Sequence, residues 1–263
     1  MEKFHFNPIP LNCKTIKYFS NIETLHLWNK EDDNFGNKIL LKPNKMVNNK
    51  NIKETQNVDI KKVFYEIVVW FNVEYTTVYT NRGLNFTFKN VTYTKTDREM
   101  FGDTIPLCVT SIGEKCYKTC TSIVSITIPS SVTLIGDNCF SGCYNLNKVV
   151  LPSTVTTIPV GCFTFCDNLS NLIISFGVKI LDDCCFGDCY NLINVEIPLS
   201  VTTLGAYCFN NCSNLKDLII PSSIISIGEY CFNNCDSLMS LFIPSSVKSF
   251  GEKCFPQHLI INY

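Results

Sequence analysis

Cysteine is the residue type whose number and spacing in this sequence could support chemistry. The chain has 263 residues and 16 cysteines, and most of these cysteines fall into two columns that recur every 23 residues. The first column is Cys116, Cys139, Cys162, Cys185, Cys208, Cys231 and Cys254. The second column is Cys120, Cys143, Cys166, Cys189, Cys212 and Cys235. Thiols at such regular intervals could bind metal ions, form disulfides or act as nucleophiles.

The spacing within the two columns favours none of these chemistries. A zinc site usually combines C-x₂₋₄-C with a second pair of ligands and rarely repeats from one structural unit to the next. Stacked cysteines could form bridges, but geometry decides this and the sequence does not contain it. A thiol is also a small apolar group that buries readily. We therefore predict two columns of reduced, packed thiols, with no metal ion and no cofactor.

The remaining polar residues show no catalytic arrangement. His5, His26 and His258 lie far apart, and a Cys–His pair would use thiols that belong to the structural columns. The glycines recur as turn residues, where we expect conformational freedom to be needed, and none forms a phosphate-binding motif. A column of hydroxyl residues is expected to satisfy backbone groups in the turns. It comprises Ser131, Thr154, Ser200, Ser223 and Ser246. We predict that the protein is not an enzyme.

A repeated unit must position these columns. The stretch Pro129–Leu151 returns in register, beginning at positions 106, 152, 175, 198, 221 and 244. Each unit carries an aromatic residue after its first cysteine and ends in alternating apolar residues, which suit a short strand buried on one side. The aromatic column is Tyr117, Phe140, Phe163, Phe186, Phe209, Phe232 and Phe255. One unit cannot bury these side chains alone, so stacked units must share a core.

The unit resembles the BspA-like, or Treponema pallidum-type, leucine-rich repeat, including protozoan (amoebal) members. The resemblance covers residues 106–263 and rests on the 23-residue period, the Ile-Pro-x-Ser-Val step, the Ile-Gly-x-x-Cys-Phe block and the Cys-x-x-Leu-x-x-Leu-x-Ile strand. It implies a leucine-rich repeat solenoid of the α/β horseshoe class, mostly β. A parallel sheet would form the concave face, with short turns or 3-10 segments on the convex side. Pro159 and Asp182 replace the glycine of the pattern, so we expect local distortion there.

The repeats also divide the chain. Residues 106–263 are predicted to form seven repeats, the last truncated as a C-terminal cap, and residues 1–105 an N-terminal capping region. In that region Ile22-x-x-Leu25-x-Leu27 has the strand spacing of the repeats and predicts a degenerate leading turn. Residues 37–62 carry seven Lys against two acidic residues. We expect a flexible, solvated loop there, with a basic binding tail as the alternative.

Two further segments near the N-terminus favour strands by composition. Residues 63–80 and 86–94 are rich in β-branched and aromatic residues and predict a strand-rich cap, with an independent ligand-binding module as the alternative. Trp28 and Trp70 are expected in the core of that cap. At the other end, His258 replaces the second cysteine, and a final short strand is predicted at 259–261. Its edge could pair with a second copy of the chain, which makes a homodimer through a solenoid end possible.

The predicted strands present a surface for a partner. Side chains alternate along a strand, so the residue between the last two apolar positions of each unit points to the concave face. This column and its neighbour supply the predicted protein-binding residues: Thr127, Lys148, Val150, Ile173, Asn194, Glu196, Asp217, Ile219 and Phe242. Adjacent apolar side chains on an outer face suggest an interaction patch. The alternative is that β-propensity alone favours Val, Ile and Phe in strands.

Charge and hydropathy limit the possible partners and location. A net charge of −1 leaves no electrostatic footprint for nucleic acid. No apolar run is long enough to cross a bilayer, and the first residues lack the apolar core of a signal peptide, so we expect a cytoplasmic protein without membrane insertion. We predict a non-enzymatic protein–protein interaction scaffold. The resemblance implies a cell-surface protein for adhesion to host cells or matrix as one alternative, and a self-associating structural protein is another. Amoebal relatives can carry extra sequence before the Phe-x-Phe-Asn-Pro-Ile-Pro stretch, so an upstream targeting element could be absent here.

Overall fold

A computed structural model describes residues 7, 9–12, 14–16, 22–40 and 62–262. Most of the Lys-rich loop predicted at 37–62 lies outside the described residues, as do His5 and Cys13. The chain divides into two compact units, Met1–Thr92 and Tyr93–Tyr263. The predicted division lies between residues 105 and 106, and the capping role predicted for the N-terminal region stays a prediction.

The described residues of unit 1, Met1–Thr92, form a parallel sheet and one short helix. Its elements are β1 (Thr24–Leu27), β2 (Glu66–Val69), β3 (Val73–Glu74), α1 (Tyr75–Thr80) and β4 (Phe86–Phe88), with β5 (Val91–Tyr93) at the boundary. Strands β1, β2 and β4 form one sheet, in which Leu25 pairs with Ile67 and Ile67 with Phe86. Leu25 and Leu27 are buried, so the segment predicted from its repeat-like spacing is a strand with its leucines in the core.

Unit 2, Tyr93–Tyr263, begins with helix α2 (Lys95–Phe101) and continues as a parallel β-solenoid. One stack of strands comprises β7 (Ser125–Thr127), β9 (Lys148–Val150), β11 (Asn171–Ile173), β13 (Asn194–Glu196), β15 (Asp217–Leu218), β17 (Ser240–Phe242) and β19 (Ile260–Asn262). These are the predicted strands. Those that pair within the stack do so in parallel, as in the register of Ser125 with Lys148. The 23-residue period therefore sets the register of the sheet.

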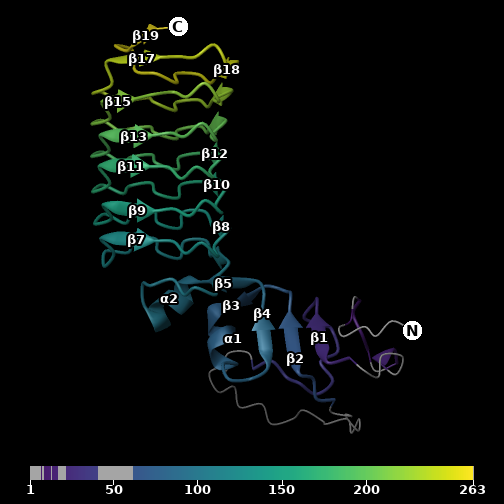
Figure 1. Cartoon of the computed structure of the whole chain (residues 1–263). Helices are drawn as coiled ribbons and strands as arrows, with labels where there is room; N and C mark the ends of the chain where they lie inside the picture. The colour runs from purple at the N-terminus through teal and green to yellow at the C-terminus, as the bar shows by residue number, and fades with distance from the viewer. Residues whose placement is uncertain (1–6, 8, 13, 17–21, 41–61, 263) are drawn as a thin grey trace. The chain divides into compact units, whose positions relative to one another are not determined.

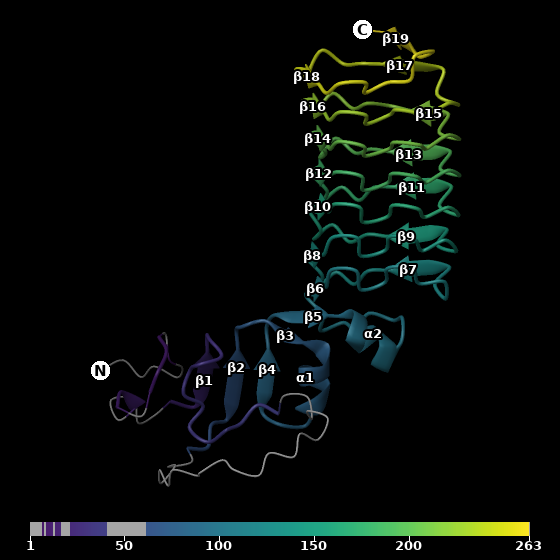
Figure 2. The same ribbon diagram turned by 180° about the vertical axis from the view of Figure 1, so that it is seen from behind.

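A second stack of two-residue strands, which the sequence analysis did not predict, lies on the other side of the repeats (Figures 1 and 2). It comprises β6 (Ser111–Ile112), β8 (Leu134–Ile135), β10 (Thr157–Ile158), β12 (Ile180–Leu181), β14 (Thr203–Leu204), β16 (Ser226–Ile227) and β18 (Ser249–Phe250). The pairing in this stack is interrupted between β8 and β10.

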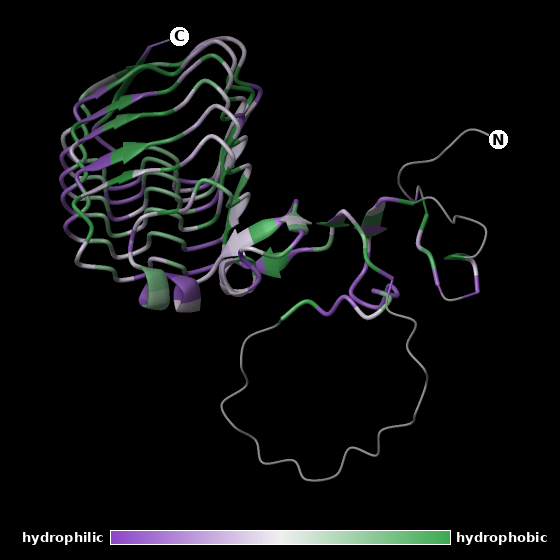
Figure 3. Ribbon diagram, turned by 60° about the horizontal axis from the view of Figure 1, so that its bottom comes forward, coloured by the Kyte–Doolittle hydropathy of each residue, from purple (hydrophilic) through white to green (hydrophobic). Residues whose placement is uncertain are grey.

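The core of unit 2 consists of like residues stacked on like residues. Phe140 and Phe163 are fully buried, and their ring centroids lie 5.2 Å apart with an interplanar angle of 4°. Phe163 stacks on Phe186 in the same way, at 5.5 Å and 3°. Hydrophobic segments consequently recur at the same place from one repeat to the next (Figure 3). This is the shared core that the repeat predicts.

The turn at Gly136 shows a different role for glycine from the one expected from the sequence. Gly136 does not have a positive φ, and a Cβ atom on it would lie 2.4 Å from the backbone nitrogen of Glu114. Glycine is needed there because the backbone of the preceding repeat approaches closely, so the expected need for conformational freedom is wrong at this position. In each repeat, a positive φ occurs two residues after this glycine position, and most of the residues there are not glycine. That column is Lys115, Asn138, Gly161, Cys184, Tyr207, Tyr230 and Lys253.

The two repeats that lack this glycine behave differently. The amide of Asp182 donates to the carbonyl oxygen of Ile158 over 3.0 Å, as the amide of Gly205 does to Leu181 over 2.7 Å. Pro159 has no amide hydrogen to donate, and the strand pairing is interrupted beside it, between β8 and β10. The expected distortion is therefore found at Pro159, whereas Asp182 keeps the register.

Candidate functional site

The predicted binding residues lie on the outward side of β7, β9, β11, β13, β15 and β17, which we call the strand face; it includes Ile219 directly after β15. The exposed fraction is 42% for Val150, 67% for Ile173, 81% for Ile219 and 59% for Phe242. The remaining predicted residues are exposed as well: Thr127, Lys148, Asn194, Glu196 and Asp217. The structure thus leaves all nine side chains accessible to a partner.

Alternation along each strand explains this exposure. Leu172 in β11, Val195 in β13 and Leu241 in β17 point inward and are buried in the core. Their neighbours on either side therefore point outward, because successive side chains of a strand lie on opposite faces. The core is filled by the inward residues, so packing inside the solenoid does not account for apolar side chains on the strand face.

The register brings the predicted residues side by side, but in three groups. Strands β7 and β9 pair with each other, β11 pairs with β13 and β13 with β15, and β17 pairs with β19. Ile173 therefore lies directly beside Glu196. The side-chain amide of Asn194 donates to that of Asn171 over 3.0 Å, which links β11 to β13 on the outward side. The group β11–β13–β15 is the longest continuous part of the face.

The strand face extends further than the sequence analysis predicted. Strand β19 begins and ends one residue later than the strand predicted at 259–261, and Ile260 pairs with Ser240. Ile260 is exposed and adds apolar surface in β19, the strand that pairs with β17. Counting forward by 23 residues could not place Ile260, because the last repeat is shortened. The run of apolar residues from Leu259 to Ile261 was the available signal.

The charged residues of the strand face form no ion pair with any other described residue. Lys148, Glu196 and Asp217 form no salt bridge within the part of the chain that the structure describes. Their charges are therefore available to a partner.

The cysteine columns lie in the core rather than at a site. The 15 cysteines among the described residues are free thiols. The Sγ atom of Cys166 donates to the carbonyl oxygen of Phe140 over 3.3 Å, and Cys143, Cys189, Cys212 and Cys235 make the equivalent contact. Burial raises the pKa of Cys116 and of Cys143 to about 12. These thiols are therefore protonated at neutral pH, and a thiolate is the reactive form of cysteine.

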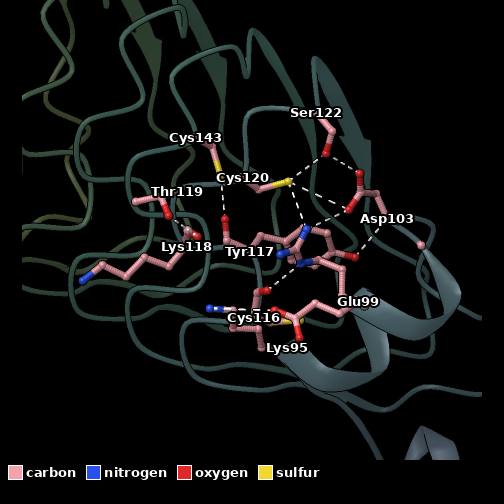
Figure 4. Close-up of polar contacts among 12 residues, drawn as sticks. Lys95, Glu99, Asp103, Cys116, Tyr117, Lys118, Thr119, Cys120, Ser122 and Cys143 are labelled. Carbon is pink, nitrogen blue, oxygen red and sulfur yellow. Dashed lines mark hydrogen bonds and ion pairs between the residues drawn. The ribbon is translucent and has the colours of Figure 1, made fainter.

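Hydrogen bonds join Arg98, Asp103, Cys120 and Ser122 of unit 2 in a polar cluster, and Figure 4 labels the last three. The Nη1 atom of Arg98 donates to Asp103 over 3.1 Å and to the Sγ atom of Cys120 over 3.3 Å. Burial alone would raise the pKa of Asp103, but hydrogen bonds from Ser122 and Arg98 lower it overall. The Nε atom of Arg98 donates to the carbonyl oxygen of Cys116 over 2.9 Å. The cluster thus supports the first repeat.

The hydroxyl column satisfies the backbone only in part. Thr154 and Ser223 each donate to a carbonyl oxygen of the preceding repeat over 2.6 Å, as expected. The buried hydroxyls of Ser131, Ser200 and Ser246 have no hydrogen-bond partner within the part of the chain that the structure describes. Among the described residues, no group of three or more His, Cys, Asp or Glu side chains is arranged to hold a metal ion.

Unit 1 has features of its own. The rings of Trp28 and Trp70 stack with centroids 5.1 Å apart, and the Nε1 atom of Trp70 donates to the Nδ1 atom of His26 over 3.2 Å. Both tryptophans are partly exposed. A cavity of about 800 Å³ is lined by residues of this unit, among them Lys30 and Phe71. Within the described residues, no helix is long and apolar enough to span a bilayer.

Comparisons with known proteins agree with the repeat. A model of the BspA type leucine-rich repeat region matches in six copies, over residues 87–198 and 179–262. A leucine-rich repeat protein from Bacteroides ovatus ATCC 8483 is 27% identical, with a TM-score of 0.60 over 76% of this chain and 55% of that one. The chain therefore spans about half the length of that protein. No curated protein matches the chain.

Two further solved structures are more distant. A leucine-rich cell surface protein from Faecalibacterium prausnitzii A2-165 is 18% identical, with a TM-score of 0.45 over 75% of this chain and 73% of that one. A leucine-rich repeat protein from T. pallidum is 22% identical, with a TM-score of 0.36 over 66% and 73%. These relatives are bacterial, so the predicted resemblance to protozoan members is not confirmed. The predicted leucine-rich repeat solenoid is confirmed, and because the family model matches most of the sequence, this chain belongs to the BspA-type leucine-rich repeat family.

Proposed function

We propose that this protein is a non-enzymatic scaffold that binds a protein partner through the strand face. The observation that carries the proposal is the row of exposed apolar side chains at Val150, Ile173, Ile219 and Phe242. A folded chain gains nothing by exposing such side chains in neighbouring repeats, and contiguous apolar surface typically marks an interaction site. Repeat solenoids commonly use an extended surface of this kind for binding.

The apolar row can contribute to the binding energy of a complex. Covering one large aliphatic or aromatic side chain contributes roughly 1.5 to 3 kcal/mol. Ile219 and Phe242 are suitable anchors, because both are largely exposed and each follows a buried residue, Leu218 or Leu241. In protein interfaces a few such anchors provide most of the binding energy.

We further propose that the protein works in a reducing compartment such as the cytoplasm. The free thiols support this location, because closely stacked cysteines would be at risk of oxidation elsewhere. A position at the cell surface, with adhesion as the role, is the alternative. The identity of the captured partner separates the two: cytoplasmic proteins support the scaffold, and matrix or surface glycoproteins support the adhesin.

Affinity capture with matched variants tests the proposal. The double variant Ile219→Asp/Phe242→Asp places charges in the apolar row. The control, Leu134→Asp/Ile180→Asp, changes two exposed apolar residues in the second stack, in β8 and β12. We expect partners that bind the wild type and the control but not the strand-face variant. Equal capture by all three proteins would refute the proposed site. Capture of only this chain itself would replace the scaffold by a self-associating protein.

A further inference from the structure

We infer that the partner segment is an amphipathic helix that carries a Lys or Arg side chain between two large apolar side chains. The inference rests on the function proposed above, because it specifies what the strand face binds. It is carried by the charges and spacing of the continuous group β11–β13–β15.

The centre of this group is acidic. Glu196 in β13 lies beside Ile173 in β11, and Ile219 follows Leu218, the residue that pairs with Val195 of β13. Along the row the order is therefore apolar, acidic, apolar. Asp217 pairs with Asn194, two residues before Glu196, and also points outward. From the strand spacing and the rise per residue, the Cα atoms of Glu196 and Asp217 lie about 8 Å apart.

These carboxylates are not neutralised by the chain itself. Lys216 precedes Asp217 and is exposed, and Lys148 lies in β9 across an interruption in the strand pairing, but neither forms a salt bridge among the described residues. An apolar partner laid over Ile173 and Ile219 would cover Glu196 as well. A covered carboxylate without a cation is strongly unfavourable, so the partner must supply one.

The spacing of the row favours a helix over an extended segment. Ile173 and Ile219 lie two strands apart, which corresponds to about 9 to 10 Å. Residues i and i+7 of a helix are separated by about 10 Å along its axis, with i+3 and i+4 between them on the same side. Residues i and i+4 of an extended strand are about 13 Å apart, and its i+2 side chain would be the central one. The helix thus places apolar, basic and apolar side chains opposite Ile173, Glu196 and Ile219.

Selection from a library of random 18-residue peptides displayed on phage tests this inference. The full chain is used as the target, in parallel with the variants Glu196→Lys/Asp217→Lys and Ile219→Asp/Phe242→Asp. Glu229→Lys/Glu252→Lys is the matched control, because it makes the same change in net charge at two exposed turn residues away from the strand face. All substituted residues are exposed, and thermal unfolding confirms that each variant is folded.

We expect the wild type and the control to select peptides with apolar residues at i and i+7 and Lys or Arg at i+3 or i+4. The Glu196→Lys/Asp217→Lys variant should select Asp or Glu at that position instead. In fluorescence anisotropy, a peptide selected on the wild type should bind this variant at least about tenfold more weakly.

The outcomes distinguish the inference from the proposed function. Peptides that require Ile219 and Phe242 but show no basic residue, or that alternate as an extended strand does, would overturn the inference and leave the strand face as a binding site. Peptides that bind the Ile219→Asp/Phe242→Asp variant as well as the wild type would overturn both. Failure of the wild type to enrich any peptide would also overturn the inference.

Discussion

The Nε atom of Arg98 donates a hydrogen bond to the carbonyl oxygen of Cys116 over 2.9 Å. In the later repeats the equivalent carbonyl accepts from a backbone amide of the preceding repeat; the carbonyl of Cys139, for example, accepts from the amide of Tyr117 over 2.8 Å. Arg98 therefore supplies, from α2, the donor that a preceding repeat would provide. Helix α2 and its polar cluster belong to unit 2 and close its first repeat.

Arg98→Ala should destabilise unit 2. It leaves the buried carbonyl of Cys116 without its donor and removes one of the donors to Asp103, which still accepts from Ser122. A buried unpaired group costs about 1 to 3 kcal/mol. Urea unfolding followed by circular dichroism measures this loss. Both tryptophans, Trp28 and Trp70, lie in unit 1, so their fluorescence reports the other unit in the same experiment.

The control for this change is Lys95→Ala on the same helix. Lys95 forms an exposed pair with Glu99 at 3.9 Å, and removing such a pair should alter stability by no more than about 0.5 kcal/mol. An Arg98→Ala protein as stable as the Lys95→Ala protein would show that Arg98 does not support the first repeat.

The two cysteine columns should respond differently to alanine. Cys162 and Cys166 are both fully buried in one repeat, but the thiol of Cys166 donates to the carbonyl oxygen of Phe140, whereas the thiol of Cys162 donates to no group among the described residues. Cys166→Ala should therefore lower the free energy of unfolding by about 0.5 to 1.5 kcal/mol more than Cys162→Ala. Urea unfolding of the two variants checks this. Equal losses would mean that the second column serves packing alone.

Stability should fall in alkali because of the buried thiols. The pKa of Cys143 is raised by burial from its ordinary value of 9.0 to about 12. Below pH 9 the thiol is protonated in both states, so its contribution is fully present. Between pH 9 and 12 the unfolded chain loses the proton and the folded chain keeps it. The free energy of unfolding then falls by up to about 1.4 kcal/mol per pH unit for each such thiol.

Cys143→Ser isolates one thiol in this pH dependence, since serine does not titrate in the range. Urea unfolding at several values between pH 9 and 12 should give a shallower decline for Cys143→Ser than for the wild type. The two proteins should show the same pH dependence below pH 9. Parallel curves throughout would contradict the raised pKa.

Neighbouring residues of β17 should differ sharply in tolerance to charge. Phe242 is exposed and Leu241 is buried. Phe242→Asp should cost about 1 kcal/mol or less, which reflects strand propensity alone. Leu241→Asp should cost more than about 3 kcal/mol, because it buries a carboxylate without a partner. Thermal unfolding compares them, and the opposite order would mean that β17 presents its other side to solvent.

Features that repeat every 23 residues could be predicted from the sequence. Counting along the chain placed Ile173, Glu196 and Phe242 on one outward side, because both register and alternation follow from spacing. The reason for Gly136 could not be predicted, since it depends on how closely the backbone of Glu114 approaches.

Features that occur only once could not be predicted from the repeat pattern either. Arg98 acts on Cys116 through tertiary geometry, and no other repeat contains an equivalent side chain for comparison. Ile260 lies on the strand face at a position that the 23-residue spacing does not predict, because the last repeat is shortened. The absence of ionic partners for Glu196 among the described residues likewise needed the structure, because the sequence places Lys residues on both sides of it.

Photo-crosslinking tests the central claim, that the strand face contacts a protein partner, most directly. A photoreactive amino acid is introduced at position 219 or 242 on the strand face, and at position 134 or 180 in the second stack. After irradiation in cell lysate, we predict cross-linked partner proteins from positions 219 and 242 and none from 134 and 180. Cross-links from 134 and 180 alone, or equally from all four positions, would contradict the account.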